Sequence, residues 1–301
     1  MPDPKTSGLF IAVGHRGLRM VSVDGEEWTH PQTGKEGETY RAVSFGNGRF
    51  AAVGSFGGAN LMASTVDGVE WKTATRDAKY VSYLRGLGFG KGMFFGLGGD
   101  PGSVGDSKPF IMTSEDGQTW GDLTPIAGRN MLRRVCFGNG RFVAVGDRGR
   151  RAASKDGREW IDAPNAKAID TLIDVTFGNG LFVGVGLHGL RMSSEDGVTW
   201  SERLAGDEGE HINSVLWTGE RFVAVGQGAT YVSPNGRKWD RQPNTNAPLI
   251  AVYGGGRFIG SHWRGRILQS ADAVIWKDAF QAEHHIEAIA FGAGDDKSTS
   301  Q

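Results

Sequence analysis

A short box with the pattern Ser-x-Asp-Gly-x-x-Trp recurs along the chain, and this repeat restricts the fold more than any other feature. Its copies lie roughly 40 residues apart, a period typical of chains built from repeated supersecondary units. Asn235 replaces the aspartate in the sixth copy and Ala273 replaces the glycine in the seventh, which predicts weaker turns there. The seven copies end at Trp28, Trp71, Trp120, Trp160, Trp200, Trp239 and Trp276.

Each box is preceded by two short apolar runs that a glycine-rich turn joins. In one unit the runs are 43–45 and 50–53, and the turn between them contains Asn47-Gly48. Asn-Gly between β-branched or aromatic runs is the strongest short-range signal for a β-hairpin. We therefore expect four antiparallel strands in each unit: A and B around the Asn-Gly turn, C ending at the box serine, and D starting at the box tryptophan. Four-stranded units of this length predict an all-β, seven-bladed β-propeller; a β-solenoid, the alternative, has shorter repeats.

The two ends of the chain complement each other. A strand of type B at 9–14 has no strand A before it, and a strand of type A at 286–292 has no strand B after it. Pairing these two strands would close the ring and remove two free sheet edges. We therefore predict an N-terminal tail at 1–8, a single propeller domain at 9–293, and a disordered C-terminal tail at 294–301.

Composition excludes several classes of protein. The formal net charge of -1 argues against binding nucleic acid by general phosphate attraction. A single cysteine, Cys136, rules out a disulfide framework or a cysteine-based zinc site, and it is expected to be a small buried residue rather than a nucleophile. No apolar run is long enough to span a membrane, and the first residues lack the pattern of a signal peptide. We expect a cytoplasmic, soluble protein in which the 48 glycines serve turns.

The boxes resemble the Asp-box of the bacterial neuraminidase repeat, in a form one residue shorter, and the resemblance covers nearly the whole chain. In that family the box is structural, so the resemblance implies architecture rather than activity. Sialidases of this kind are six-bladed and carry an Arg-Ile-Pro motif that is missing from this chain. The photosystem II assembly factors have seven blades, which implies docking on a partner protein as one hypothesis.

Histidines gather in the variable loops. If A–B and C–D turns share one rim of the disc, B–C and D–A loops share the other, where function is expected. Histidine also suits loops in general, but neutral imidazoles bind zinc, iron or copper and act as acid–base groups. Candidate ligands of a divalent transition metal are His15, His188, His211, His262 and His284. Candidate catalytic residues are His188, His262, His284, His285 and Tyr40.

Arginines form a second pattern, on strand A. Counting back four residues from the strand-ending aromatic gives arginine in three consecutive units, and Arg134 adds a fourth. Guanidinium groups bind carboxylate, sulfate or phosphate in a bidentate manner, whereas the alternative is interblade ion pairing with Asp174 or Glu287. The candidate ligand-binding residues are Arg41, Arg85, Arg133, Trp263 and Arg16.

These patterns lead to one main hypothesis and two rivals. The first is an axial pocket that binds, and as an enzyme transforms, a small or oligomeric anionic substrate resembling an acidic sugar. Lyase- or hydrolase-type chemistry, acid–base or metal-assisted, would be its mechanism. The rivals are a non-catalytic scaffold or assembly factor that docks a protein on the same rim, and a lectin with several equivalent glycan sites. Asp100 and Asp106, in an enlarged loop, match no calcium-loop spacing.

Overall fold

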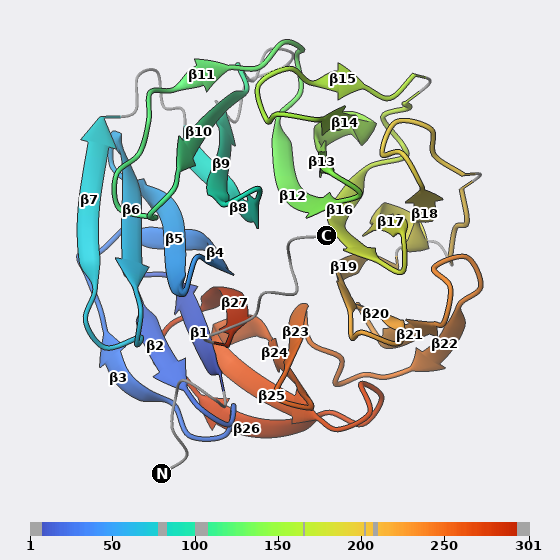
Figure 1. Ribbon diagram of the computed structural model, residues 1–301. Coiled ribbons are helices and arrows are strands. Elements are labelled where there is room, and N and C mark those ends of the chain that lie inside the picture. The colour runs from blue at the N-terminus through green and yellow to red at the C-terminus, as the bar shows by residue number, and fades with distance from the viewer. Residues whose placement is uncertain are drawn as a thin grey trace.

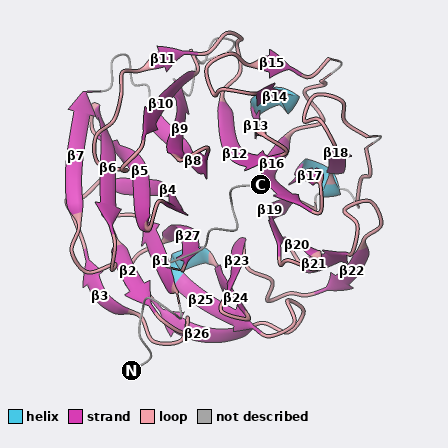
Figure 2. Ribbon diagram, viewed as in Figure 1, coloured by secondary structure: helices cyan, strands magenta, loops and turns pink. Residues whose placement is uncertain are grey.

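The computed structural model describes residues 8–77, 83–99, 108–164, 166–201, 203–206 and 210–293, which form seven antiparallel sheets arranged in a ring (Figure 1). Figure 2 shows that strands make up almost all of the regular structure. The predicted seven-bladed β-propeller is therefore confirmed. Apart from Gly8, the predicted tails lie outside the described residues, as do Asp100 and Asp106.

Each blade is one sheet, in which the strands follow one another from the inside of the ring outward. Blades 1 and 2 contain β27 (Ile286–Gly292), β1 (Leu9–Gly14), β2 (Arg19–Ser22) and β3 (Thr29–Gln32), then β4 (Thr39–Gly46), β5 (Arg49–Phe56), β6 (Ala59–Thr65) and β7 (Lys72–Asp77). Blades 3 and 4 contain β8 (Tyr83–Gly90), β9 (Met93–Gly99), β10 (Phe110–Ser114) and β11 (Thr124–Pro125), then β12 (Leu132–Gly138), β13 (Arg141–Gly146), β14 (Arg151–Ser154) and β15 (Ile161–Asp162).

The remaining blades follow the same order. Blade 5 contains β16 (Leu172–Gly178), β17 (Leu181–Gly186) and β18 (Arg191–Ser194), and an isolated bridge from Arg191 to Leu204 takes the place of its fourth strand. Blades 6 and 7 contain β19 (Ile212–Trp217), β20 (Phe222–Gly226), β21 (Ala229–Ser233) and β22 (Asp240–Pro243), then β23 (Ile250–Gly254), β24 (Arg257–Ser261), β25 (Arg266–Ser270) and β26 (Lys277–Gln281). Among the described residues, single 3₁₀ turns lie in three B–C loops: η2 (Asp147–Gly149), η3 (Leu187–Gly189) and η4 (Trp263–Gly265).

The first and last strands close the ring as predicted. β27 pairs antiparallel with β1, from Leu9 opposite Gly292 to Gly14 opposite Ile286. The backbones approach closely at the end of this pairing, because a Cβ atom on Gly14 would lie 2.0 Å from the carbonyl oxygen of His285. Glycine is therefore required at the point where the two ends of the chain meet.

The core is divided into seven clusters, one between each pair of neighbouring blades. Alternate side chains of a strand point to opposite faces of its sheet. Leu9 and Ile11 of β1 accordingly pack toward blade 2, whereas Phe10 and Ala12 pack toward blade 7. The inner strands therefore need apolar residues on both faces, which explains the nearly continuous apolar runs in the sequence.

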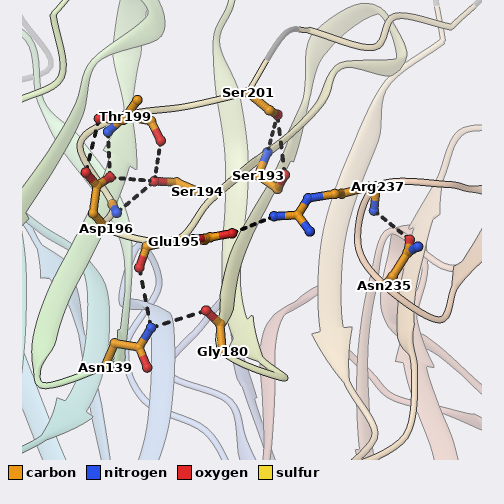
Figure 3. Close-up of polar contacts among 11 residues, drawn as sticks. Asn139, Gly180, Ser193, Ser194, Glu195, Asp196, Thr199, Ser201, Asn235 and Arg237 are labelled. Carbon is orange, nitrogen blue, oxygen red and sulfur yellow. Dashed lines mark hydrogen bonds and ion pairs between the residues drawn. The ribbon is translucent and has the colours of Figure 1, made fainter.

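The boxes form the C–D turns, and all seven share one hydrogen-bonding pattern. In the fifth box, Asp196 Oδ1 accepts from the amide of Thr199 at 2.6 Å (Figure 3) and from the amide of Val198 at 2.9 Å. The Trp200 indole donates to the carbonyl oxygen of Gly197 at 3.1 Å. This use of the tryptophan in the turn explains why strand D begins after the tryptophan and not at it, which corrects the prediction from the sequence.

The two irregular boxes make the same turn as the others. Asn235 Oδ1 accepts from two amides at 3.0 and 2.9 Å, as the box aspartates do. Ala273 adopts the glycine conformation, with φ at 67°, and its carbonyl oxygen accepts from the Trp276 indole at 2.9 Å. No bond of the pattern is missing at these two places, so the expected weakening does not appear as lost hydrogen bonds.

Asparagine side chains of the A–B turns join neighbouring blades on the same side of the disc. The Asn139 amide, from blade 4, donates to the carbonyl oxygens of Gly180 and Glu195 in blade 5, at 3.2 and 3.4 Å (Figure 3). Asn47 makes the equivalent bonds from blade 2 to Gly92 and Glu115 in blade 3, at 2.8 and 2.9 Å. We call this side, with its A–B turns and boxes, the turn face.

The opposite side carries the B–C and D–A loops, and we call it the loop face. The register of blade 2 demonstrates the arrangement, since Thr39 lies opposite Ser55, and Asn60 lies opposite Arg76, at one end of the sheet. Phe45, Phe50 and Thr65 lie opposite one another at the other end. Among the described residues, no helix is long and apolar enough to cross a membrane.

Candidate functional site

The inner strand of six blades carries a β-bulge at the same position, near the loop face. In blade 2 the register jumps from Tyr40 to Ala42, which leaves Arg41 outside the ladder. A bulge re-aims the side chain of its extra residue and is common next to functional sites. The bulge residues are also those reached by counting back along strand A: Arg41, Arg85, Arg133, Ile173, Asn213 and Glu287.

Three of these bulge residues, Arg41, Arg85 and Arg133, follow one another around the ring and form what we call the arginine arc. Burial, together with the positive charges of Arg41 and Arg133, lowers the pKa of Arg85. Within the described part of the chain, Arg85 has no ion pair, and its buried Nε atom has no hydrogen-bond partner. The Asp147 and Glu287 carboxylates act against this lowering but form no ion pair with Arg85 among the described residues.

The other arginines have acidic partners. Arg41 lies 3.8 Å from Glu287 Oε1 in blade 1, and Arg133 makes two contacts with the Asp147 carboxylate in its own blade, one of them at 2.9 Å. Arg134 lies 4.0 Å from Asp174 in blade 5. Interblade ion pairing, the alternative that the sequence left open, thus applies to Arg41 and Arg134 but not to Arg85.

Beside the arginine arc lies a cluster of imidazole and carboxylate groups, which we call the His–Glu cluster: His15, His285 and Glu287. The Nε2 atom of His15 is 2.7 Å from Glu287 Oε1, and the His15 and His285 rings meet edge to face at 5.0 Å. Trp263 stacks on His285 at 5.3 Å with an interplanar angle of 16°, and 58% of Trp263 is exposed. Arg41 touches this cluster through Glu287, so the two groups form one continuous site.

Electrostatics favour a neutral imidazole at His285. Burial lowers its pKa, Glu287 acts against this, and His15 adds to it. The Nδ1 atom of His285 is buried and has no hydrogen-bond partner. Burial, followed by the charge of Arg266, also lowers the pKa of His262. Neutral imidazoles accept protons and bind metal ions, so the cluster can do either.

The predicted histidines do not all meet in one place. His188 and His211 form a separate pair between blades 5 and 6, with ring centroids 5.6 Å apart, and the His188 amide donates to His211 Nδ1 at 3.3 Å. His284 lies 3.6 Å from the carboxylate of Glu283. Among the described residues, only His15, His285 and Glu287 bring three metal-ligating atoms within 4.8 Å of one another. The five histidines proposed as ligands are therefore not gathered around one point.

Two further candidates lie apart from the cluster. Tyr40 is 3% exposed in the core between blades 1 and 2, under the Arg19 guanidinium, and burial raises its pKa. The bulge explains this, because it turns Tyr40 into the interface while Arg41 stays near Glu287. Arg16 is exposed and lies 3.4 Å from Glu36. Cys136 is half-buried and not fully buried as predicted, but burial, followed by the Asp174 charge, raises its pKa, which fits the expectation of an unreactive thiol.

Sequence reasoning misses part of the site and a cavity elsewhere. It treats Glu287 only as an ion-pair partner, although this residue occupies the same counted position as the three arginines. Asp147, which holds Arg133, stands in a B–C loop and gives no separate signal. A cavity of about 510 Å³ lies on the turn face at the boundary of blades 7 and 1, and its lining includes Glu26, Arg257, Ser270, Asp272 and Lys277.

Comparisons with known proteins bear on the fold. No protein-family model matches the sequence, and no curated protein matches it. A solved structure described as YCF48 bound to D1 peptide is similar over 81% of this chain and 81% of its own, with 18% identity and a TM-score of 0.60. YCF48 from Cyanidioschyzon merolae is similar over 86% of this chain and 93% of its own, with 15% identity and a TM-score of 0.58.

A third similar structure carries an enzyme name. It is virginiamycin B lyase from Staphylococcus aureus, which matches 82% of this chain and 85% of its own, with 9% identity and a TM-score of 0.65. Identities this low establish a shared propeller fold and nothing about activity. The neighbours therefore include both a protein described as bound to a peptide and a protein named as a lyase.

Proposed function

We propose that this propeller binds a carboxylate-bearing ligand, of the acidic-sugar type, on its loop face through the arginine arc. The observation that carries the proposal is Arg85, a partly buried guanidinium repelled by two others, which makes no ion pair among the described residues, although the Asp147 and Glu287 carboxylates act on it at longer range. The three guanidiniums share two carboxylates, Asp147 and Glu287, and confining the remaining positive charge is costly unless an anion arrives to neutralise it. A carboxylate offers two oxygens to such a group and suits its planar geometry.

The surroundings of the arc support a sugar acid as its ligand. Trp263 is 58% exposed and lies on the same face, stacked on His285. An exposed indole can cover the apolar face of a sugar ring, while the arginines hold the carboxylate. His285, whose pKa is lowered by burial, is the candidate on this face for lyase- or hydrolase-type proton transfer.

Calorimetric titration with an oligogalacturonate at low salt tests the proposal, with a neutral oligogalactan as the comparison ligand. Hydrogen bonds to charged groups contribute about 1.5–3 kcal/mol, so Arg85→Gln should weaken binding about tenfold or more. Arg158→Gln is the matched control, because Arg158 is exposed in a box on the turn face. The proposal fails if the wild-type protein does not prefer the acidic oligosaccharide, or if both variants bind it equally well.

A second candidate is docking of a protein segment on the same face. It is favoured by the exposure of Trp263, because tryptophan and arginine are the residues most enriched in binding hot spots. One similar structure is described as bound to a peptide, which is a property of that protein. This candidate is favoured if an acidic peptide binds more tightly than the oligogalacturonate and if Trp263→Ala abolishes the binding of that peptide.

A further inference from the structure

The His–Glu cluster has the composition of a metal centre. Two imidazoles and one carboxylate are a common donor set for divalent zinc and for iron(II), and they leave coordination positions open for water or a ligand. The three donor atoms lie within 4.8 Å of one another. Zinc binds nitrogen and oxygen at about 2.0–2.2 Å, so the ligand atoms of a tetrahedral ion lie about 3.3 Å apart. The donor atoms are thus at most about 1.5 Å farther apart than such a site needs.

The backbone fixes the positions of all three residues. The His15 amide donates to the carbonyl oxygen of His285 at 2.9 Å, directly after the last pair of the β1–β27 ladder. Glu287 is the bulge residue of β27, two positions beyond His285. The three donors therefore depend on a rigid, closed sheet and not on a long loop, as a preorganised metal site requires.

The contacts of the cluster leave donor capacity unused. The Nδ1 atom of His285 is buried without a hydrogen-bond partner, and such groups are rare unless a water or an ion satisfies them. Trp263 covers one face of the same ring and restricts its orientation. His15 and Glu287 share one hydrogen bond of 2.7 Å, which a metal ion would replace.

We propose that His15, His285 and Glu287 form a binding site for a divalent transition metal ion, with zinc as the simplest occupant. This goes beyond the arginine-based function and does not depend on it. Because Arg41 lies 3.8 Å from the same oxygen of Glu287, its charge opposes a bare cation and favours an ion that also carries an anionic ligand.

The test uses the full-length chain, freed of metal by a chelator and dialysed. Zinc is titrated by calorimetry, and cobalt(II) by its visible absorption, which reports the geometry of the ligands. We expect one equivalent of zinc to bind. His285→Asn and Glu287→Gln should each weaken zinc binding roughly tenfold or more, since even outer-sphere changes cost 10–100-fold. His30→Asn is the matched control, because His30 is exposed and lies after a box tryptophan, on the turn face.

Two outcomes would overturn the proposal: no saturable zinc binding by the wild-type protein, or an equal loss in His30→Asn and His285→Asn. If His285→Asn does not fold, as judged by circular dichroism, then Glu287→Gln and the cobalt spectrum of the wild-type protein decide. Arg85→Gln removes a positive charge coupled to Glu287, so it should not weaken zinc binding, whereas it should weaken anion binding; failure of the metal site and failure of anion binding are therefore separate results.

Discussion

Replacing Asp196 by asparagine removes a charge from the fifth box but keeps an oxygen acceptor in the same place. Burial acts to raise the pKa of Asp196, but hydrogen bonds from Thr199, Val198 and Ser194 outweigh it and lower the pKa from 3.8 to about 2. At about 1.36 kcal/mol per pKa unit, this difference corresponds to about 2.4 kcal/mol. The side chain is partly exposed, so water screens the charge and we expect a loss of about 1 kcal/mol.

The effect depends on pH in a direction that the structure fixes. The pKa of Asp196 is lower in the folded protein than in the unfolded chain, so its charge stabilises the fold fully above the unfolded value of 3.8. This stabilisation disappears as the pH falls through about 2. The difference in unfolding free energy between the wild type and Asp196→Asn should therefore be constant from pH 7 to pH 5 and shrink below pH 4.

Urea unfolding followed by circular dichroism, repeated between pH 7 and pH 3, measures this difference. Asp196→Ala also removes the acceptor for two amides and should cost about 1 kcal/mol more than Asp196→Asn at every pH. Asn235→Asp is the reciprocal variant, because Asn235 already makes the same two bonds without the charge. Near neutral pH, Asn235→Asp should raise the free energy of unfolding by about the amount by which Asp196→Asn lowers it. A loss in Asp196→Asn that is the same at pH 7 and pH 3 would refute the reasoning.

Three further outcomes follow from single contacts. Arg85→Gln should raise the free energy of unfolding of the ligand-free protein by a few tenths to about 1 kcal/mol, because it removes a partly buried charge that Arg41 and Arg133 repel. A lower melting temperature than that of the wild type would contradict this. Asn139→Gly keeps a residue suited to the φ of 45° but loses the hydrogen bonds to blade 5, so urea unfolding should show a loss of stability of about 1 kcal/mol. Asn139→Ala should lose more, because alanine is also disfavoured at this φ. Gly157→Ala should lower the free energy of unfolding by more than about 2 kcal/mol in thermal unfolding. Its Cβ would lie 2.1 Å from the Phe95 ring, and the φ of 77° disfavours alanine. A melting temperature equal to that of the wild type would exclude this clash.

The architecture could be predicted because the turns of each repeat are set by residues that lie close together in the sequence. The Asn-Gly turn sets strands A and B, and the box ties its own C–D turn through bonds that span a few residues, such as those of Asp196. Seven copies of a four-stranded unit then leave little choice of fold. The sequence pattern places the start of strand D one residue or more too early, because the indole of the tryptophan belongs to the turn.

The site could be predicted only in part, because it depends on register. Counting along strand A finds Arg41, Arg85 and Arg133, since the bulge recurs at one position in the repeat. His15 and His285 are far apart in the sequence, and only the pairing of Gly14 with Ile286 brings them together. Sequence reasoning assigns Tyr40 to the site because a sequence does not reveal that a bulge reverses which neighbour faces the core.

The pairing of β27 with β1 makes the first blade the place where the two ends of the chain join, and we call this pairing the seam. His15 follows one edge of that seam, and His285 and Glu287 belong to the other. A proteolytic cut or a binding partner that parts the two edges would scatter the three donors while the other six sheets stay intact. Metal occupancy would then report whether β1 and β27 are paired, and a tightly bound ion would stabilise this pairing and with it the closed ring.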